Sequence, residues 1–299
     1  MLPKISVITP SYNQAEFLQA TLDSVIGQNY TYLEYIVMDG GSTDGSVEMI
    51  RKVESRLSYW QSQPDGGQSA AINAGWARAT GDWLCWLNSD DIFLPHTLTR
   101  VSQLIMENPQ AVAIIGECRL IDRAAQDVGA KYARTFDLET LVTTSGGVPG
   151  QPAVFLSRQV LADVGFLAED LHYSMDWEYW LRLALTYPPE KFLVVYEPLA
   201  AWRSWEGAKT LTGVQKICDQ HRFALERLFK GKLVGYRQQW YARAMAGTWR
   251  KQAKLERQAG QPLASLRSLS MMLSFTPDLR SWQYAAKFIA KSILQKTDS

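Results

Sequence analysis

Two hydrophobic periods alternate along the front of the chain. Short apolar runs rich in β-branched and aromatic residues predict strands, and apolar positions at helical spacing predict helices between them. The predicted strands are Lys4–Thr9, Leu33–Met38, Ser58–Ser62 and Trp83–Leu87. The predicted helices are Ala15–Ile26, Val47–Val53 and Ser69–Ala79. This alternation predicts βαβ units, and therefore an α/β fold with a mostly parallel sheet.

Polar loops follow three of the predicted strands, at Pro10–Gln14, Asp39–Ser46 and Asn88–Asp91. In parallel sheets, ligands bind at the carboxyl ends of the strands. We therefore expect these three loops to surround one pocket.

The pattern is less regular beyond the fourth strand. A hairpin is expected at Glu117–Ala133 and a flexible glycine-rich loop at Thr143–Gln151. The other predicted elements are strands at Ala111–Ile115, Ala153–Leu156 and Phe192–Tyr196, and helices at Ser157–Val164 and Asp176–Tyr187.

The tail after about Lys209 has helical spacing almost throughout. Tyr241–Ala259 and Pro262–Phe275 predict a helical hairpin that breaks at Gly260. The pair resembles one tetratricopeptide-type unit, although a solenoid needs several. We predict two domains, a nucleotide-binding domain over residues 1–212 and a basic helical region over residues 213–299.

Composition limits the class of protein. The 299 residues are 46% hydrophobic and 20% charged, which is typical of a globular chain with a large core. The three cysteines, Cys85, Cys118 and Cys218, are odd in number and widely spaced, so they indicate neither a disulfide framework nor a zinc site. Met1–Pro10 lacks the apolar run of a signal peptide, and no stretch reaches the roughly 20 apolar residues of a membrane span. A cytoplasmic location is expected.

The net charge of +1 hides an asymmetry between the two ends. Residues 215–299 hold 16 Lys and Arg against 5 Asp and Glu, whereas residues 1–214 hold 15 against 25. The tail mixes cations with aromatic residues, as do membrane-binding segments. The residues concerned are Arg237, Trp240, Tyr241, Arg243, Trp249, Arg250, Lys251 and Lys254. Contact with the inner membrane face is one interpretation, and a solvated face of a packing hairpin is the other. Nucleic-acid binding is not expected, because the front is acidic and no motif is present.

Candidate chemistry begins with Asp90 and Asp91. Two adjacent carboxylates repel each other unless a cation or a donor compensates. Carboxylate oxygens suit Mg²⁺ or Mn²⁺. The alternative is that one of them caps a turn near Pro95. Asp39 ends a strand and is placed to accept a hydrogen bond from a base or ribose, or is an ordinary turn residue.

Asp176 and Glu178 open a strongly amphipathic helix, Asp176–Tyr187. Either carboxylate is a candidate general base, and the alternative is a favourable interaction with the helix dipole. Side chains two residues apart point in different directions, so only one is expected to act. The aromatic residues Trp177, Tyr179, Trp180, Trp202 and Trp205 are candidates for stacking on sugars or for the core.

Another pair, Gly66 and Gly67, precedes a predicted helix, and backbone N–H groups at a helix N-terminus favour phosphate. The alternative is that the two glycines form a plain turn. Neither a P-loop nor a dinucleotide fingerprint is present.

Four segments together resemble family-2 glycosyltransferases of the GT-A fold, over about Ile5–Thr210. The segments are Ser6–Gln28, Tyr35–Ser46, Pro64–Asp91 and Met175–Ala184. The resemblance implies an α/β/α sandwich and an inverting, metal-dependent transfer from a nucleotide-diphosphate sugar, of the UDP or dTDP type, with Mn²⁺ or Mg²⁺. A glycan or lipid-linked acceptor in surface polysaccharide or lipopolysaccharide synthesis is the implied setting.

The resemblance also implies a role for each matching residue. Thr9, Pro10 and Tyr12 would line the nucleoside pocket, with Asp39 on a uracil-like base and Asp65 against the nucleotide. Asp91 would be the metal ligand, and Asp90 would contact the ribose or a metal-bound water.

On the acceptor side, Asp176 would be the base, with Glu178 as runner-up. The acceptor-side loop would include Gly150 and Gln151, with Trp177 nearby, and Arg203 would pair with the diphosphate.

Two departures from the family pattern stand out. Asn88 occupies the place of an acid, and Trp205 occupies the place of a histidine in an Arg-x-His-x-x-Ser stretch. A catalytically degenerate nucleotide-sugar-binding or scaffold protein of the same fold is therefore the alternative. A nucleotidylyltransferase is disfavoured, because Pro10–Asn13 is not a glycine-rich loop.

Overall fold

The chain divides into two units in the computed structural model, which describes residues 1–143, 149–230 and 237–297. The first unit comprises Met1–Asp137 with Val148–Ala208, and the second comprises Leu138–Gly147 with Lys209–Ser299. The predicted boundary after residue 212 lies four residues further along the chain and omits the inserted segment.

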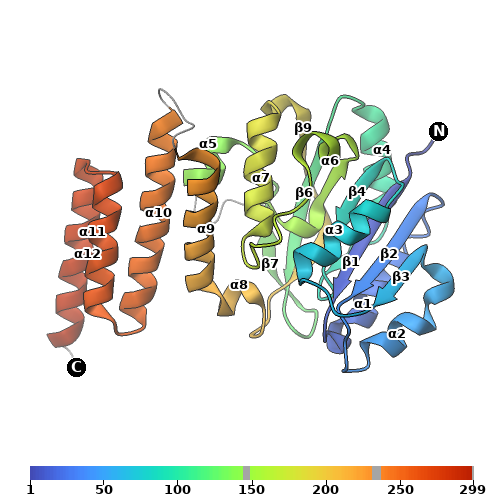
Figure 1. The fold of residues 1–299 in the computed structure, drawn as a ribbon, viewed down its shortest axis with the longest axis horizontal. Helices are drawn as coiled ribbons and strands as arrows, with labels where there is room; N and C mark the ends of the chain where they lie inside the picture. Colours follow the sequence, from blue (N-terminus) through green and yellow to red (C-terminus); the bar gives the residue numbers. More distant parts are fainter. Residues whose placement is uncertain (144–148, 231–236, 298–299) are drawn as a thin grey trace. The chain divides into compact units, whose positions relative to one another are not determined.

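A nine-stranded sheet forms the centre of the first unit (Figure 1). Its order is β3-β2-β1-β4-β8-β6-β9-β5, with β7 beside β6. The strands are β1 (Ile5–Ser11), β2 (Leu33–Asp39), β3 (Tyr59–Ser62), β4 (Trp83–Trp86), β5 (Ile92–Phe93), β6 (Ala113–Ile121), β7 (Asp127–Lys131), β8 (Val154–Ser157) and β9 (Phe192–Arg203).

Parallel pairing is confined to two parts of the sheet. β1 pairs in parallel with β2 and β4, β2 with β3, and β6 with β9. β8 is antiparallel to both of its neighbours, β7 to β6, and β5 to β9. The predicted α/β fold is confirmed, and the front half is parallel as expected. The rest is mixed: β6 and β7 form the predicted antiparallel hairpin, and β8 and β5 also run antiparallel to their neighbours.

Helices cover both faces of the sheet. In β1, Ile5 and Val7 share a core cluster with residues of α1, α2 and α4, while Ile8 meets Gly75 of α3 on the other face. Trp86 of β4 stacks on Trp180 of α7 on that second face, with ring centroids 5.5 Å apart. The helices of this unit are α1 (Ala15–Ile26), α2 (Ser46–Lys52), α3 (Gln68–Arg78), α4 (Thr97–Glu107), α6 (Gln159–Val164) and α7 (Met175–Thr186).

Two strands are longer than predicted. β6 continues past Ile115 to Ile121, with an irregular register near Glu117, and β9 continues past Tyr196 to Arg203 beside it. The polar and bulged positions hide this continuation from a hydrophobic pattern. As a result, β9 carries Arg203 to the strand ends where the expected pocket lies.

The second unit is helical, as predicted. Its helices are α5 (Leu138–Thr143), α8 (Lys209–Thr212), α9 (Val214–Phe229), α10 (Arg237–Gln258), α11 (Pro262–Phe275) and α12 (Leu279–Thr297). α10 and α11 are the expected hairpin, and Gly260 lies between them with a φ of +71°. α5 packs on α10, where Arg243 lies 3.6 Å from Glu139. Within the described ranges, no helix has the length and apolar character needed to cross a bilayer. Residues 144–148 of the predicted glycine-rich loop lie outside those ranges.

Candidate active site

Three loops meet where β1, β2 and β3 end, and Gly40 marks the meeting point. A Cβ atom on Gly40 would lie 3.3 Å from the Tyr12 ring and 3.2 Å from Oδ2 of Asp65. Tyr12 is 64% exposed, and Asp65 is exposed as well. Two of the three loops expected to surround one pocket, Pro10–Gln14 and Asp39–Ser46, therefore meet here together with the Asp65 segment. The third expected loop, Asn88–Asp91, follows β4 at the same end of the sheet.

Asp39 is enclosed by donors from its own loop and from β3. The residue is 1% exposed, and its carboxylate accepts hydrogen bonds from the Gly41 and Ser42 N–H groups at 3.1 and 2.9 Å. The hydroxyl groups of Ser42 and Ser62 each donate to it at 2.6 Å. Asp39 therefore fixes the shape of the loop that follows β2.

The start of the expected nucleoside pocket is mostly closed. Thr9 is fully buried, and its hydroxyl lies 3.0 Å from that of Tyr35 inside the core. Pro10 is also buried. Of the three residues expected to line this pocket, only Tyr12 presents its side chain to solvent, because Thr9 and Pro10 still belong to β1.

The two adjacent carboxylates lie in different environments. Asp91 is fully buried: Oδ1 accepts the Arg203 N–H at 2.9 Å, and Oδ2 accepts the Asn88 amide at 3.1 Å. Burial, together with the neighbouring charge of Asp90, raises the pKa of Asp91 well above its ordinary value. Asp90 is half-buried, and its Oδ2 accepts the Trp205 indole N–H at 3.1 Å. The geometry thus favours Asp90 over Asp91 as an accessible oxygen ligand.

Arg203 is a buried clamp. Its side chain donates to the carbonyl oxygens of Asp90 and Asp122 at 2.9 Å and of Arg123 at 3.1 Å. The residue is only 3% exposed, so the guanidinium expected to pair with a diphosphate instead ties the Asp90–Asp91 turn to the end of the β6 hairpin.

A chain of side-chain amide groups holds Asn88, the residue that stands in place of an acid. Gln68 donates to Oδ1 of Asn88 at 2.7 Å, and Nδ2 of Asn88 donates to Oε1 of Gln151 at 3.1 Å. Gln151 in turn donates to the Trp86 carbonyl oxygen at 2.7 Å. Gln151 thus lies beside the carboxylates, as its expected place near the acceptor requires, but is 9% exposed. The Gln68 contribution was missed, since only the tertiary structure joins positions 68, 88 and 151.

Position 150 has no room for a side chain, so glycine is required there. A Cβ atom there would lie 2.5 Å from Sγ of Cys118 in β6. Any larger residue would displace the segment that carries Gln151.

The α7 carboxylates also separate by environment. Glu178 is 2% exposed and forms an ion pair with Arg182, which donates from Nε at 3.1 Å. Arg182 also donates to the Val164 and Phe166 carbonyl oxygens, so the pair binds the α6–α7 connection to α7. Asp176 is half-buried, and its Oδ1 accepts the N–H of the next residue at 2.7 Å. Asp176 is the better-placed candidate base.

The aromatic residues of α7 belong to the core. Trp177 is 6% exposed, and Tyr179 and Trp180 are fully buried. Trp177 therefore offers no exposed ring to an acceptor. Ahead of this helix, His172 is exposed, and its Nδ1 would lie 3.6 Å from a Cβ on Gly67, whose φ is +100°. His172 thus approaches the loop that begins with Asp65.

The described residues contain no group of three or more His, Cys, Asp or Glu side chains arranged for a metal ion. Mg²⁺ and similar ions are often held by one or two carboxylates together with the phosphates of a substrate. The single accessible carboxylate of Asp90 fits that mode, whereas a cage made wholly of protein ligands does not fit.

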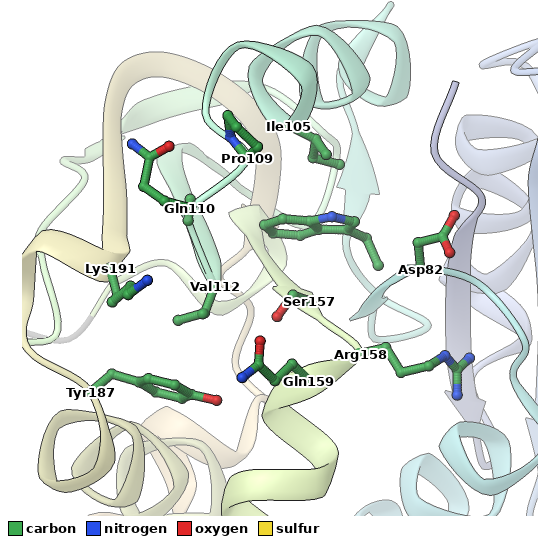
Figure 2. A pocket seen from close by; sticks show the side chains of 12 residues that line it. Asp82, Ile105, Pro109, Gln110, Val112, Ser157, Arg158, Gln159, Tyr187 and Lys191 are labelled. Carbon is green, nitrogen blue, oxygen red and sulfur yellow. The ribbon is translucent and has the colours of Figure 1, made fainter. Parts of the chain in front are cut away.

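A cavity of about 360 Å³ opens at the opposite edge of the sheet, where β4, β6 and β9 begin and β8 ends (Figure 2). It is lined by Asp82, Trp83, Ile105, Pro109, Gln110, Ala111, Val112, Ser157, Arg158, Gln159, Tyr187 and Lys191. None of the expected site residues lies there, so it is separate from the candidate active site.

Comparison with solved structures supports the fold. S. aureus TarS residues 1–349, in complex with UDP-GlcNAc, superposes with a TM-score of 0.67 at 17% identity, covering 97% of this chain and 89% of that one. The Pyrobaculum calidifontis mannosyltransferase PcManGT, in complex with GDP-Man and Mn²⁺, gives a TM-score of 0.52 at 18% identity, covering 99% and 87%. The fold is therefore GT-A-like.

Comparison of sequences supports the family. An uncharacterized glycosyltransferase of Mycobacterium tuberculosis H37Rv is 35% identical over 229 residues, covering 74% of this chain and 85% of the relative. The putative teichuronic acid biosynthesis glycosyltransferase TuaG of Bacillus subtilis is 32% identical over 117 residues, 38% of this chain and 46% of TuaG. The model of glycosyl transferase family 2 matches residues 6–131, which include all three strand-end loops. Because the chain is 35% identical to a glycosyltransferase over 74% of its own length and matches the family model over residues 6–131, it belongs to glycosyl transferase family 2.

Proposed function

We propose that this glycosyltransferase transfers a sugar from a nucleotide-diphosphate donor to an acceptor hydroxyl with inversion, using Asp176 as the base. One observation carries the proposal: the first turn of α3 joins the two halves of the site. Gln68 binds Asn88 beside Asp90, and the Ser69 hydroxyl donates to the Met175 sulfur, next to Asp176, at 2.8 Å. The carboxylate turn and the candidate base are thus anchored to the same turn of one helix.

The nucleoside would lie where the three loops meet. Tyr12 offers an exposed ring for stacking, Asp39 holds its loop in place for the base, and Asp65 lies beside Gly40. The TarS and PcManGT complexes contain UDP-GlcNAc and GDP-Man, which supports a nucleotide-sugar donor. We propose a UDP or dTDP sugar.

Asp90 is the proposed ligand of Mn²⁺ or Mg²⁺, together with the donor's phosphates. The bound ion would stabilise negative charge on the leaving diphosphate. Asp91 and Arg203 act as positioning residues, because they hold the turn that presents Asp90.

Asp176 removes the proton of the acceptor hydroxyl as that oxygen attacks the anomeric carbon and the bond to the diphosphate breaks. A positioned carboxylate of this kind contributes roughly 10² to 10⁴ in rate. One displacement needs no covalent intermediate, so the configuration at the anomeric carbon is inverted.

The proposed acceptor is a growing glycan or a lipid-linked sugar in surface polysaccharide synthesis. The name of the Bacillus subtilis relative, which refers to teichuronic acid biosynthesis, supports this class. We also propose a cytoplasmic location with the basic second unit in contact with the inner membrane face.

Calorimetric titration with UDP, dTDP, GDP and CDP, with and without Mn²⁺, tests the donor site. We expect metal-enhanced binding of one diphosphate. If a folded sample bound none of them, the result would favour the alternative of a catalytically degenerate scaffold protein. Asn88, which occupies the place of an acid, also favours that alternative.

A further inference from the structure

The last helix, α12, exposes a line of apolar side chains. Leu279 is 73% exposed, Trp282 56% and Ile289 38%. Their spacing of three and seven residues places them on one side of a helix. We call these three residues the α12 stripe. The adjoining side of α12 is used within the unit, where Ala285 and Phe288 pack in the core of the helical bundle.

The charges around the α12 stripe have a single sign. Between Leu279 and Thr297 the sequence contains four cations and no acid. Two of the cations, Arg280 and Lys287, are exposed. The acid just before the helix, Asp278, accepts the Ser281 N–H at 2.8 Å and so serves as a helix cap.

The neighbouring helix adds to the exposed apolar area. On α11, Leu263 is 74% exposed, Leu266 45% and Met271 40%, and the cation of that helix, Arg267, is exposed too. Both terminal helices thus combine apolar and basic surface.

Two aromatic residues of α10, Tyr241 and Trp249, are instead half-buried against other helices of the unit. Arg222 lies 3.9 Å over the Trp249 ring, and Tyr241 meets Phe275 with centroids 6.1 Å apart. The sequence pattern offered α10 as the membrane-facing segment, but Tyr241 and Trp249 are half-buried and contact protein, whereas the α12 residues are exposed.

We propose that the α12 stripe docks the second unit on an anionic lipid bilayer. Apolar side chains, with tryptophan among them, enter the headgroup boundary while flanking cations meet anionic headgroups. Charge favours this occupant over the same stripe of a second copy, which would bring like charges together. The inference rests on the proposed membrane contact and is independent of the transfer chemistry.

Sedimentation of the full chain with lipid vesicles tests the proposal. We expect binding to phosphatidylglycerol vesicles, weak binding to phosphatidylcholine vesicles, and loss of binding in high salt. A Trp282→Ser/Ile289→Ser variant should lose about 30-fold in partitioning, because its inserted apolar area is removed. An Arg280→Gln/Lys287→Gln variant should lose about 30-fold on phosphatidylglycerol alone.

Phe223→Ser in α9 is the matched control, since Phe223 is 50% exposed in the same unit. It should bind vesicles as the unchanged protein does. The proposal is overturned if the unchanged protein ignores phosphatidylglycerol, if the stripe variant binds normally, or if the control loses binding equally. A concentration-dependent dimer that the stripe variant abolishes would assign the surface to a second copy instead. Nucleotide titration of the same variants reports separately on the transferase site.

Discussion

At the scale of single residues, burial separates pairs of acids that look equivalent in sequence. Glu178 is enclosed with Arg182, whereas Asp176, two positions earlier, keeps an accessible carboxylate. Asp91 is enclosed with Arg203 and Asn88, whereas Asp90 is half-buried. In each pair, one acid is buried with its partners in the fold and the other is half-buried, which is why the proposed chemistry uses Asp176 and Asp90.

We expect Asp176→Asn to lower the transfer rate by about 10² to 10⁴, because the amide cannot accept a proton. Nucleotide binding, measured by calorimetry, should stay unchanged. Glu178→Gln is the matched control: it should cost about 2 kcal/mol of unfolding free energy by weakening a buried ion pair, with little effect on the rate of the folded protein. Full transfer by Asp176→Asn would remove Asp176 from the role of base.

A second residue-scale prediction concerns the carboxylate turn. Asp90→Asn should abolish the Mn²⁺-dependent part of nucleotide binding, because a neutral amide is a poor ligand for the ion. Asp91→Asn should instead lower the melting temperature and keep the metal effect. If the two variants exchanged these behaviours, Asp91 would be the metal ligand.

The buried carboxylate of Glu34 in β2 should make the stability of the fold depend on pH. Burial alone would raise its pKa, but hydrogen bonds from Ser6, Thr80 and Lys4 outweigh burial and lower the pKa from 4.5 to about 2. Because the pKa of Glu34 is lower in the folded than in the unfolded protein, its ionised carboxylate stabilises the fold at pH values above the unfolded-state pKa. This contribution is lost as the pH falls towards 2.

Glu34→Gln should therefore cost about 2 kcal/mol near pH 6 and much less near pH 2.5. Denaturant unfolding of both proteins at the two pH values measures the difference. An equal difference at both values would show that ionisation of Glu34 does not stabilise the fold.

At the scale of elements, α3 depends on close packing against β1. A Cβ atom on Gly75 would lie 2.6 Å from Cγ2 of Ile8. Overpacking of this kind costs about 1–3 kcal/mol, and the better helix propensity of alanine returns about 1 kcal/mol. The first turn of α3 joins both halves of the site, so a shift of this helix would reach the chemistry.

Gly75→Ala should thus lower the unfolding free energy by up to about 2 kcal/mol and weaken nucleotide binding. In the Ile8→Ala/Gly75→Ala double variant, the loss should be smaller than the sum of the single losses, because the clashing methyl is gone. If the losses of unfolding free energy in the two single variants added up in the double variant, the contact between positions 8 and 75 would not be the source of the strain.

At the scale of the whole chain, the second unit includes a segment that interrupts the sequence of the first. α5 comes from the middle of the first unit's sequence but belongs to the second unit, and its Leu138, Leu141 and Val142 are buried. Removing residues 209–299 would therefore leave the apolar helix α5 without the helices of its own unit.

A truncation after Ala208 should expose α5, so we expect aggregation in size-exclusion chromatography. The same truncation with Leu141→Ser and Val142→Ser should be more soluble, because less apolar surface is exposed. A monomeric plain truncation that melts at the temperature of the full chain would contradict the dependence of α5 on the second unit.

Local patterns determined much of this protein. The alternating strands and helices of the front half, the β6–β7 hairpin and the helical tail follow from hydrophobic period, turn residues and glycine breaks. The family's loops and acids were also visible, because chemistry at strand ends needs particular residue types in sequence order.

Only the tertiary structure decided what depends on contacts between distant positions. The length of β9 comes from pairing with β6, and the partners of Asn88 come from α3 and the segment before β8. Similarly, α5 packs on α10, which lies far along the chain. Burial decided which acid of each pair stays accessible and which aromatic residues are core. A hydrophobic period reports the face on which a residue lies, whereas the partner on that face is set by the packing of the whole chain.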